Sequence, residues 1–494
     1  MLHWRRSPLL LVVLVAATAI SACTAADTGA HSGTAGAPPR PYDGTPWSGG
    51  ADTSTERDPL STFAVDVDTA SYGYARRLIA DGRLPERTSV RPEEFVNSFR
   101  QGYSEPAGDG FAVHVDGARP PRTREGGDGT RLMRVGLQTR AEDRASRPDA
   151  ALTFVIDVSG SMDEPGRLDL VKDALHTLVD QLRPTDSIAV VEFSSEARVL
   201  REMTPVSDAR RLHDAVDSLR TRDSTNLEAG LVLGYRVARD GFRAGRTNRV
   251  IVLSDGLANV GSTDAEPILR RVRDEAEKEI ALLGVGVGSD YGDRLMEQLA
   301  DRGDGFVVYV SEREQARKMF VDQLPAALSV RALDAKVQVS FDPAAVRSYR
   351  LIGYDNRAVA DEDFRDDRAD GGEVGPGHSV TALYAVQLAE GAPASARAAR
   401  VQVRWTDPGD HRPAETYQSV RVADLDPAFD AASPRLRTCY AAAFFAEALR
   451  GSDDGAQPRL GDLATIADRA ATATEDPDVR ELARTIRAAE ELRR

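Results

Sequence analysis

An apolar segment that ends in a carboxylate and two hydroxyls is the feature that most constrains this chain. The run beginning at Phe154 leads directly into Asp157, and Ser159 and Ser161 follow at alternate positions before a helical pattern begins. Open α/β sheets bind ligands outside the carboxyl ends of their strands. Carboxylate and hydroxyl oxygens suit small hard cations such as Mg²⁺ or Mn²⁺. The motif therefore predicts an α/β sheet with a metal site at one edge.

The surrounding segment, residues 149–330, repeats the alternation of strand and helix that such a sheet requires. Continuous apolar runs such as Val250–Leu253 and Ile280–Val287 are separated by amphipathic stretches such as Leu168–Leu182. Strands that are apolar on both faces are typical of parallel sheets covered by helices on both sides. We therefore expect an α/β fold, with a doubly wound and mostly parallel sheet, in this part of the chain.

The segments on either side follow different patterns. Residues 331–426 contain alternating apolar and polar runs, which predict an antiparallel β domain. Residues 56–148 are expected to form an N-terminal region whose strands, near residues 111–140, join that β domain. Residues 433–494 are rich in Ala, Leu and Arg and predict a helical C-terminal domain.

The N-terminus has the pattern of an export signal. Arg5 and Arg6 precede an apolar stretch from Leu9 to Ile20, which is too short to span a bilayer comfortably. The stretch ends in Ile-Ser-Ala-Cys23, which resembles a bacterial lipobox, and this resemblance implies lipidation of Cys23. An ordinary secretory signal cut near this point is the alternative. We expect a signal peptide over residues 1–23, then a flexible tether over residues 24–55, rich in Gly, Ala, Ser, Thr and Pro. A lipid anchor would hold the protein to the bilayer on the extracytoplasmic face of the cell membrane.

Composition limits the remaining function classes. The chain has 494 residues, too many for one compact core, and a net charge of −15, which argues against a nucleic-acid partner. Besides Cys23 there is only Cys439, which lies on an apolar helical face and is expected to be a buried small hydrophobe. The exported protein must therefore be stabilised by its cores rather than by disulfides.

Two further motifs complete a specific set. Ser-Thr225-Asn precedes a helical pattern, and Leu-Ser-Asp255-Gly follows the strand Val250–Leu253. With the Asp-x-Ser-x-Ser motif, they resemble the metal-ion-dependent adhesion site of von Willebrand factor type A domains. The resemblance implies a Mg²⁺ or Mn²⁺ site with the following ligands: Asp157, Ser159, Ser161, Thr225 and Asp255. The chain departs from the family at Arg222-Asp-Ser, where relatives often carry glycine.

The resemblance extends beyond this domain. Phe63–Tyr72, Leu351–Arg357 and Thr381–Tyr384 look like segments of a bacterial lipoprotein subfamily. Its members carry an N-terminal region, a central von Willebrand A domain and a C-terminal domain of unknown function. This subfamily implies no particular enzymatic activity.

The chemistry of the predicted site favours binding over reaction. Serine ligands leave the cation incompletely neutralised, so an open coordination position should accept a carboxylate from another molecule. We therefore expect a non-enzymatic adhesion module, whose partner is an envelope or extracellular protein that offers an Asp or Glu. Two alternatives stay open: a structural envelope scaffold whose metal is dispensable, and a metal-dependent hydrolase that uses Asp66 or the metal site.

Weaker motifs are expected to be structural. Asp66-Val-Asp68 resembles the opening of haloacid-dehalogenase-type phosphatases but lacks their usual following residues, which favours a turn or cap. The acidic run Asp361–Gly371 places Arg368 where a Ca²⁺-binding loop needs an oxygen ligand, so a solvated loop is expected. The seven histidines are scattered along the chain without zinc-ligand spacing.

Overall fold

The computed structural model describes most of the chain from residue 52 onward. The residues that it leaves undescribed are 1–51, 66, 122–128, 142–146, 223, 256–267, 269, 273, 275–279, 289–295, 297–298, 301–302, 304, 311–312, 318, 321–323, 325–329, 368, 370 and 452–457. The predicted signal peptide, Cys23 and most of the predicted tether lie outside the described residues.

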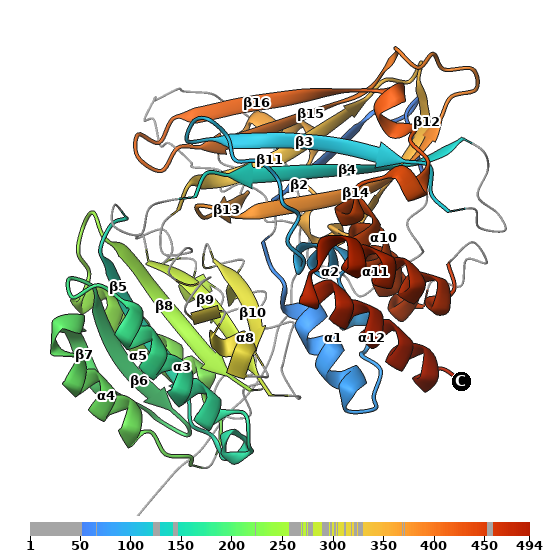
Figure 1. The fold of residues 1–494 in the computed structure, drawn as a ribbon. Coiled ribbons are helices and arrows are strands. Elements are labelled where there is room, and N and C mark those ends of the chain that lie inside the picture. Colours follow the sequence, from blue (N-terminus) through green and yellow to red (C-terminus); the bar gives the residue numbers. More distant parts are fainter. Residues whose placement is uncertain are drawn as a thin grey trace, which may run out of the picture. The chain divides into compact units, whose positions relative to one another are not determined.

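The central unit is a six-stranded α/β sheet (Figure 1). Its strands, in spatial order, are β10 (Phe306–Val310), β9 (Ile280–Val287), β8 (Thr247–Ser254), β5 (Ala150–Asp157), β6 (Ser187–Phe193) and β7 (Ala197–Pro205). All neighbours pair in parallel except β6 and β7, which form an antiparallel pair at one edge. Every residue of β5 is buried, as expected for a central strand with helices on both faces. The predicted α/β fold is confirmed.

Two separate hydrophobic clusters cover the faces of this sheet. One contains apolar residues of α3 (Leu168–Gln181), α4 (Ala209–Ser218) and α8 (Arg313–Arg317). The other contains residues of α5 (Leu227–Asp240). Just before α5, the side chain of Asn226 accepts a hydrogen bond from the Ala229 amide at 3.0 Å, which caps the first turn of the helix.

Two antiparallel sheets share a further hydrophobic core. The first has the order β1 (Thr53–Ser54), β12 (Val346–Ile352), β14 (Ser379–Leu388), β4 (Thr130–Thr139) and β3 (Phe111–Ala118). The second has the order β13 (Gly372–Val374), β11 (Ala332–Phe341), β15 (Arg397–Thr406) and β16 (Pro413–Arg421), with β2 (Leu60–Ala64) also paired to β11. Aromatic contacts join the sheets, including Phe341 with Tyr384 at 5.6 Å between ring centroids. Segments before and after the α/β unit thus build one β sandwich, because β4 pairs with β14.

The C-terminal helices are α10 (Pro434–Arg450), α11 (Leu460–Thr474) and α12 (Pro477–Leu492). They share a core with two helices from the start of the chain, α1 (Ala70–Ala80) and α2 (Pro92–Asn97). The ring of Phe95 lies 5.9 Å from that of Phe445, and Figure 1 shows α1 beside α12. The N-terminal region therefore contributes to the helical core as well as to the β sandwich, which the sequence pattern did not indicate.

The predicted tether extends too far. Thr53 and Ser54 pair with β12, and the buried hydroxyl of Thr55 donates to the Val346 carbonyl at 2.6 Å. Backbone pairing with a strand distant in sequence makes these residues part of the sandwich. Within the described part of the chain, no helix combines the length and hydrophobicity needed to cross a bilayer.

Candidate metal centre

The two predicted carboxylate ligands lie at the same edge of the α/β sheet. Asp157 is the last residue of β5, and Asp255 follows the last residue of β8. The strands are parallel neighbours in which Ile156 faces Leu253, so both strands end at the same level. Both carboxylate residues are almost completely buried, with 0% and 2% exposure.

The loop after β5 joins the two carboxylates through hydroxyl groups. Ser161 donates through its Oγ to Asp255 Oδ1 at 2.9 Å, and Ser159 Oγ lies 3.1 Å from Ser161 Oγ. The amide of Ser159 donates to Asp157 Oδ1 at 2.9 Å. Asp157 is therefore linked to Asp255 by a continuous hydrogen-bond chain that runs through the Ser159 amide and then through the hydroxyls of Ser159 and Ser161.

The loop that carries Thr225 lies against the loop after β5. The Arg222 amide donates to the Val158 carbonyl at 2.6 Å, and the Asn226 amide donates to the Ser194 carbonyl at 2.7 Å. Between these anchors Thr225 is buried. Ser224 has a φ of 54°, a left-handed conformation that glycine would adopt more easily. The absence of glycine noted in the sequence thus coincides with a strained position in this loop.

The environment of Asp157 disfavours its charge. Burial raises the pKa of Asp157 to about 6, and the nearby charge of Asp255 adds to this effect. Hydrogen bonds from Ser254 Oγ, at 2.6 Å, and from Ser159 lower the pKa but do not offset the burial. No cationic side chain among the described residues pairs with Asp157, and a metal ion would stabilise such a buried carboxylate.

Arg167, just before α3, is a functional candidate that the sequence reading missed. Its Nη1 donates to Asp255 Oδ2 at 2.5 Å and to the Ser161 carbonyl at 3.2 Å, while Nη2 donates to Glu164 at 2.6 Å. The arginine is buried, and Gly288, with a φ of 81°, has no side chain where Arg167 passes. The sequence feature that could have indicated Arg167 is a basic residue at the start of the helix that follows the Asp-x-Ser-x-Ser motif.

Arg167 contacts the Oδ2 atom of Asp255, whereas Ser161 contacts Oδ1. The arginine therefore orients the carboxylate and compensates part of its charge. The donor set consists of carboxylate and hydroxyl oxygens, which fits Mg²⁺ or Mn²⁺. Asp157, Ser159, Ser161, Thr225 and Asp255 are the residues that would hold the ion.

The weaker motifs have structural roles where the structure describes them. Asp68 is buried, accepts from the Val307 amide at 2.7 Å and pairs with Arg357 at 3.1 Å, while Asp66 lies outside the described residues. In the acidic run, the carbonyls of Asp366 and Ala369 accept from the buried ammonium of Lys336 at 2.6 and 2.8 Å. That run is therefore partly tied to β11 rather than wholly solvated.

Cys439 is fully buried, as predicted, and its thiol contacts Gln101 Oε1 at 3.1 Å. Burial raises the pKa of this thiol, which disfavours the reactive thiolate.

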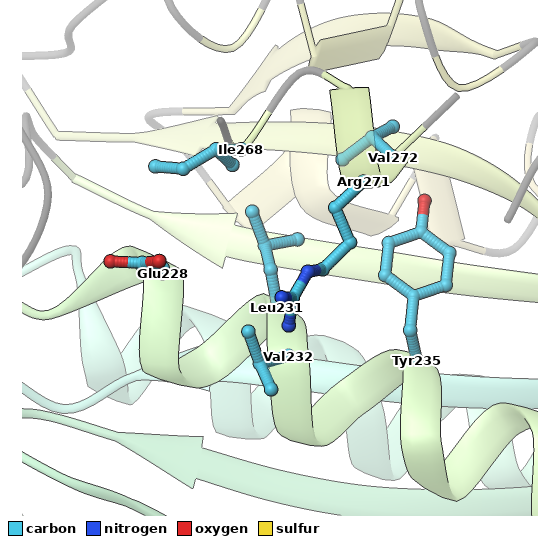
Figure 2. Close-up of a pocket in the computed structure, with 7 residues that line it drawn as sticks. All are labelled: Glu228, Leu231, Val232, Tyr235, Ile268, Arg271 and Val272. Atoms are coloured by element: carbon cyan, nitrogen blue, oxygen red, sulfur yellow. The ribbon is translucent and has the colours of Figure 1, made fainter. Parts of the chain in front are cut away.

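A separate pocket lies between α5 and the segment that contains Ile268 and Val272 (Figure 2). Its lining residues are Glu228, Leu231, Val232, Tyr235, Ile268, Arg271 and Val272. None of the predicted metal ligands is among them, so this pocket is distinct from the candidate metal centre.

Comparison with protein families matches three parts of the chain. Residues 151–322 match the von Willebrand factor type A domain, and residues 48–126 match a family described as von Willebrand factor. Residues 326–492 match the C-terminal domain of the uncharacterized protein YfbK. Von Willebrand A domains are commonly involved in adhesion and protein–protein interaction, typically bind Mg²⁺ or Mn²⁺, and are generally non-enzymatic.

Individual proteins are also similar to this chain. The uncharacterized protein YfbK of Escherichia coli K12 is 33% identical over 424 residues, which cover 80% of this chain and 72% of the relative. Human inter-alpha-trypsin inhibitor heavy chain H3 is 30% identical over 174 residues, only 19% of its length. A solved von Willebrand factor type A structure from Catenulispora acidiphila has a TM-score of 0.47 at 19% identity, and the match covers 77% of this chain and 91% of that one.

The agreement with YfbK runs through the α/β unit and into the segment that forms the sandwich and the C-terminal helices. The chain therefore belongs to the family of YfbK, in which a von Willebrand factor type A domain is combined with a YfbK C-terminal domain.

Proposed function

We propose that this protein is a metal-dependent protein-binding module that is held at the extracytoplasmic face of the cell membrane by a lipid on Cys23. In this proposal Asp157, Ser159, Ser161, Thr225 and Asp255 hold Mg²⁺ or Mn²⁺. An Asp or Glu side chain of a partner protein completes the coordination. The observation that carries the proposal is the link from Asp157 to Asp255, at the end of two adjacent strands, through the Ser159 amide and the hydroxyls of Ser159 and Ser161.

The charges at the site support a binding role. Among the buried groups, two carboxylates and the guanidinium of Arg167 leave one net negative charge, and a divalent ion would change this to one net positive charge. The carboxylate of Glu164 also pairs with Arg167, but it is 64% exposed, so water screens its charge. A buried centre with excess positive charge attracts a carboxylate from outside. Arg167 would thus make the loaded site depend more strongly on the carboxylate of its partner.

Calorimetry with Mg²⁺ tests the ligand assignment. The unsubstituted protein should bind Mg²⁺, and Asp157→Asn should abolish the heat of binding, because it removes one of the two carboxylates. Asp149→Asn is the matched control, since Asp149 lies at the opposite end of β5 and is only partly buried. Equal heats for Asp157→Asn and the unsubstituted protein would rule out the proposed ligand role.

The partner is tested by crosslinking and pull-down from native envelopes in Mg²⁺ and in EDTA. A protein that is captured in Mg²⁺ and lost in EDTA, and also lost with Asp157→Asn, supports adhesion through the metal. A partner set that is indifferent to EDTA favours the alternative, a structural envelope scaffold. Mass spectrometry of the mature N-terminus tests the anchor, and an unmodified Cys23 retained in the mature chain would contradict it.

A further inference from the structure

Two histidines from neighbouring helices meet on the surface of the α/β unit, away from the candidate metal centre. His176 lies on α3 and His213 on α4, and their Nδ1 atoms are 2.7 Å apart. Their ring planes are inclined by only 23°. The opposite nitrogen of each ring contacts a carboxylate: His176 Nε2 is 3.1 Å from Asp217, and His213 Nε2 is 3.2 Å from Asp180. Their side chains are 30% and 28% exposed, so solvent ions can reach them.

The three contacts of this pair need one more hydrogen than two neutral rings supply. Each of the three contacts needs a hydrogen between its two heavy atoms, and two neutral imidazoles carry only two N–H groups. When both Nε2 atoms donate to their carboxylates, the Nδ1 lone pairs face each other. A proton or a metal ion must then lie between the Nδ1 atoms.

We propose that His176 and His213 form a second metal site, which binds a transition-metal ion such as Zn²⁺, Ni²⁺ or Cu²⁺ through their Nδ1 atoms. A metal-ligating histidine commonly donates its other N–H to a carboxylate, and both rings have such a partner. The ring nitrogens must separate slightly to admit the ion. Among the described residues no group of three or more His, Cys, Asp or Glu side chains converges, so water completes the coordination.

The ligand chemistry separates this site from the Mg²⁺ centre. Imidazole nitrogens favour Zn²⁺, Ni²⁺ and Cu²⁺, whereas the oxygen ligands around Asp157 and Asp255 favour Mg²⁺ or Mn²⁺. Positive charges also lie near the pair, because Lys172 and Arg220 donate to the Asp217 carbonyl at 3.3 and 2.5 Å. The two histidines would therefore bind the metal ion through their ring nitrogens, and not because negative charge is in excess around them.

A bound ion would link α3 to α4, two helices that cover the same face of the sheet. An ion that binds the native state alone raises the melting temperature, by an amount that grows with the logarithm of the free ion concentration above its Kd. The proposed site is thus a place where a transition metal would stabilise this face of the adhesion domain.

Titration of the purified protein with Zn²⁺ and Ni²⁺, in excess Mg²⁺ to occupy the other centre, tests the site. One ion per chain should bind and raise the melting temperature. His176→Asn and His213→Asn should each weaken binding about tenfold or more. His411→Asn is the matched control and should bind as the unsubstituted protein does, because His411 lies on the loop between β15 and β16.

Equal binding by the two histidine variants and the unsubstituted protein would overturn the proposal. So would the absence of binding in the unsubstituted protein, which would mean that the pair shares a proton only. If the variants do not fold, crystals of the unsubstituted protein soaked in Zn²⁺ give an independent answer. An anomalous-scattering peak between the two rings supports the site, and its absence contradicts it.

Discussion

A buried carboxylate lies at each end of strand β5, and the two differ in the groups that neutralise their charge. At the amino end Asp186 pairs with Arg147 through contacts of 2.5 and 3.0 Å and accepts from the amides of Ala150 and Arg183, both at 2.8 Å. At the carboxyl end the hydrogen bonds that Asp157 accepts within the described part of the chain come from a serine amide and from hydroxyls. Both residues are 0% exposed. Burial alone therefore does not distinguish them.

Their pKa values show the difference. Burial would raise the pKa of Asp186, but its hydrogen bonds to Arg147 and two amides outweigh this and hold the pKa below its usual value. For Asp157 burial prevails, and the pKa rises to about 6. A buried carboxylate that is paired with a cationic side chain stabilises the fold. A buried carboxylate without such a partner can instead bind a metal ion. The amino end of β5 thus contacts a carboxylate with a structural role, and its carboxyl end carries the carboxylate that we propose as a metal ligand.

The same substitution at each end should have opposite effects on stability, and the larger effect is at Asp186. Asp186→Asn leaves the buried Arg147 without its charge partner, which should reduce the free energy of unfolding by about 3–5 kcal/mol. Mg²⁺ binding should persist under conditions where the variant is folded. Urea denaturation measures the loss, and a change below about 1 kcal/mol would contradict the structural role of this pair.

Asp157→Asn should instead stabilise the metal-free protein at pH 7 by about 1–3 kcal/mol, because it removes a buried charge that lacks a cationic partner. The folded pKa of about 6 exceeds the ordinary value of 3.8, so the folded state retains a proton that the unfolded state has lost. Stability of the metal-free protein should therefore fall as the pH rises from about 4 to about 6 and then stay level.

Urea denaturation in EDTA tests whether Asp157→Asn is more stable than the unsubstituted protein. The urea midpoints of the two proteins are compared across that pH range. The pH-dependent difference between them should disappear below pH 4. A variant that is less stable at pH 7 would show that the Asp157 charge is already compensated in the metal-free state.

Arg167 gives the smallest expected effect and sharpens the comparison further. Arg167→Gln removes the positive charge beside Asp255, so Mg²⁺ should bind more tightly by about 1 kcal/mol, roughly fivefold. Arg167→Lys keeps the charge and should bind Mg²⁺ much as the unsubstituted protein does. Calorimetry measures both variants. Weaker binding by Arg167→Gln would indicate that orienting Asp255 matters more than the charge of the arginine.

The local pattern predicted the cluster of Asp157, Ser159 and Ser161, whereas Thr225 and Asp255 were expected as ligands from the resemblance to von Willebrand A domains. Asp157 ends a wholly apolar run, and Asp255 follows another. Parallel strands of one sheet present their carboxyl ends at the same edge, so strand direction places both carboxylates there, and the pairing of β5 with β8 brings them close together. The link through Ser161 follows from its position two residues after Ser159, in the loop that begins where β5 ends. The role of Arg167 could not be predicted in this way, because its pairing with Asp255 spans 88 positions in the chain.

The sequence by itself determined the class of each segment: an α/β sheet over the central part, antiparallel strands around it and helices at the end. These properties depend on the periodicity of apolar residues, which is local to each element. The tertiary structure alone decided that α1 and α2 pack with the C-terminal helices and that His176 meets His213. Contacts between distant segments depend on how whole elements pack together, which no short stretch of residues records.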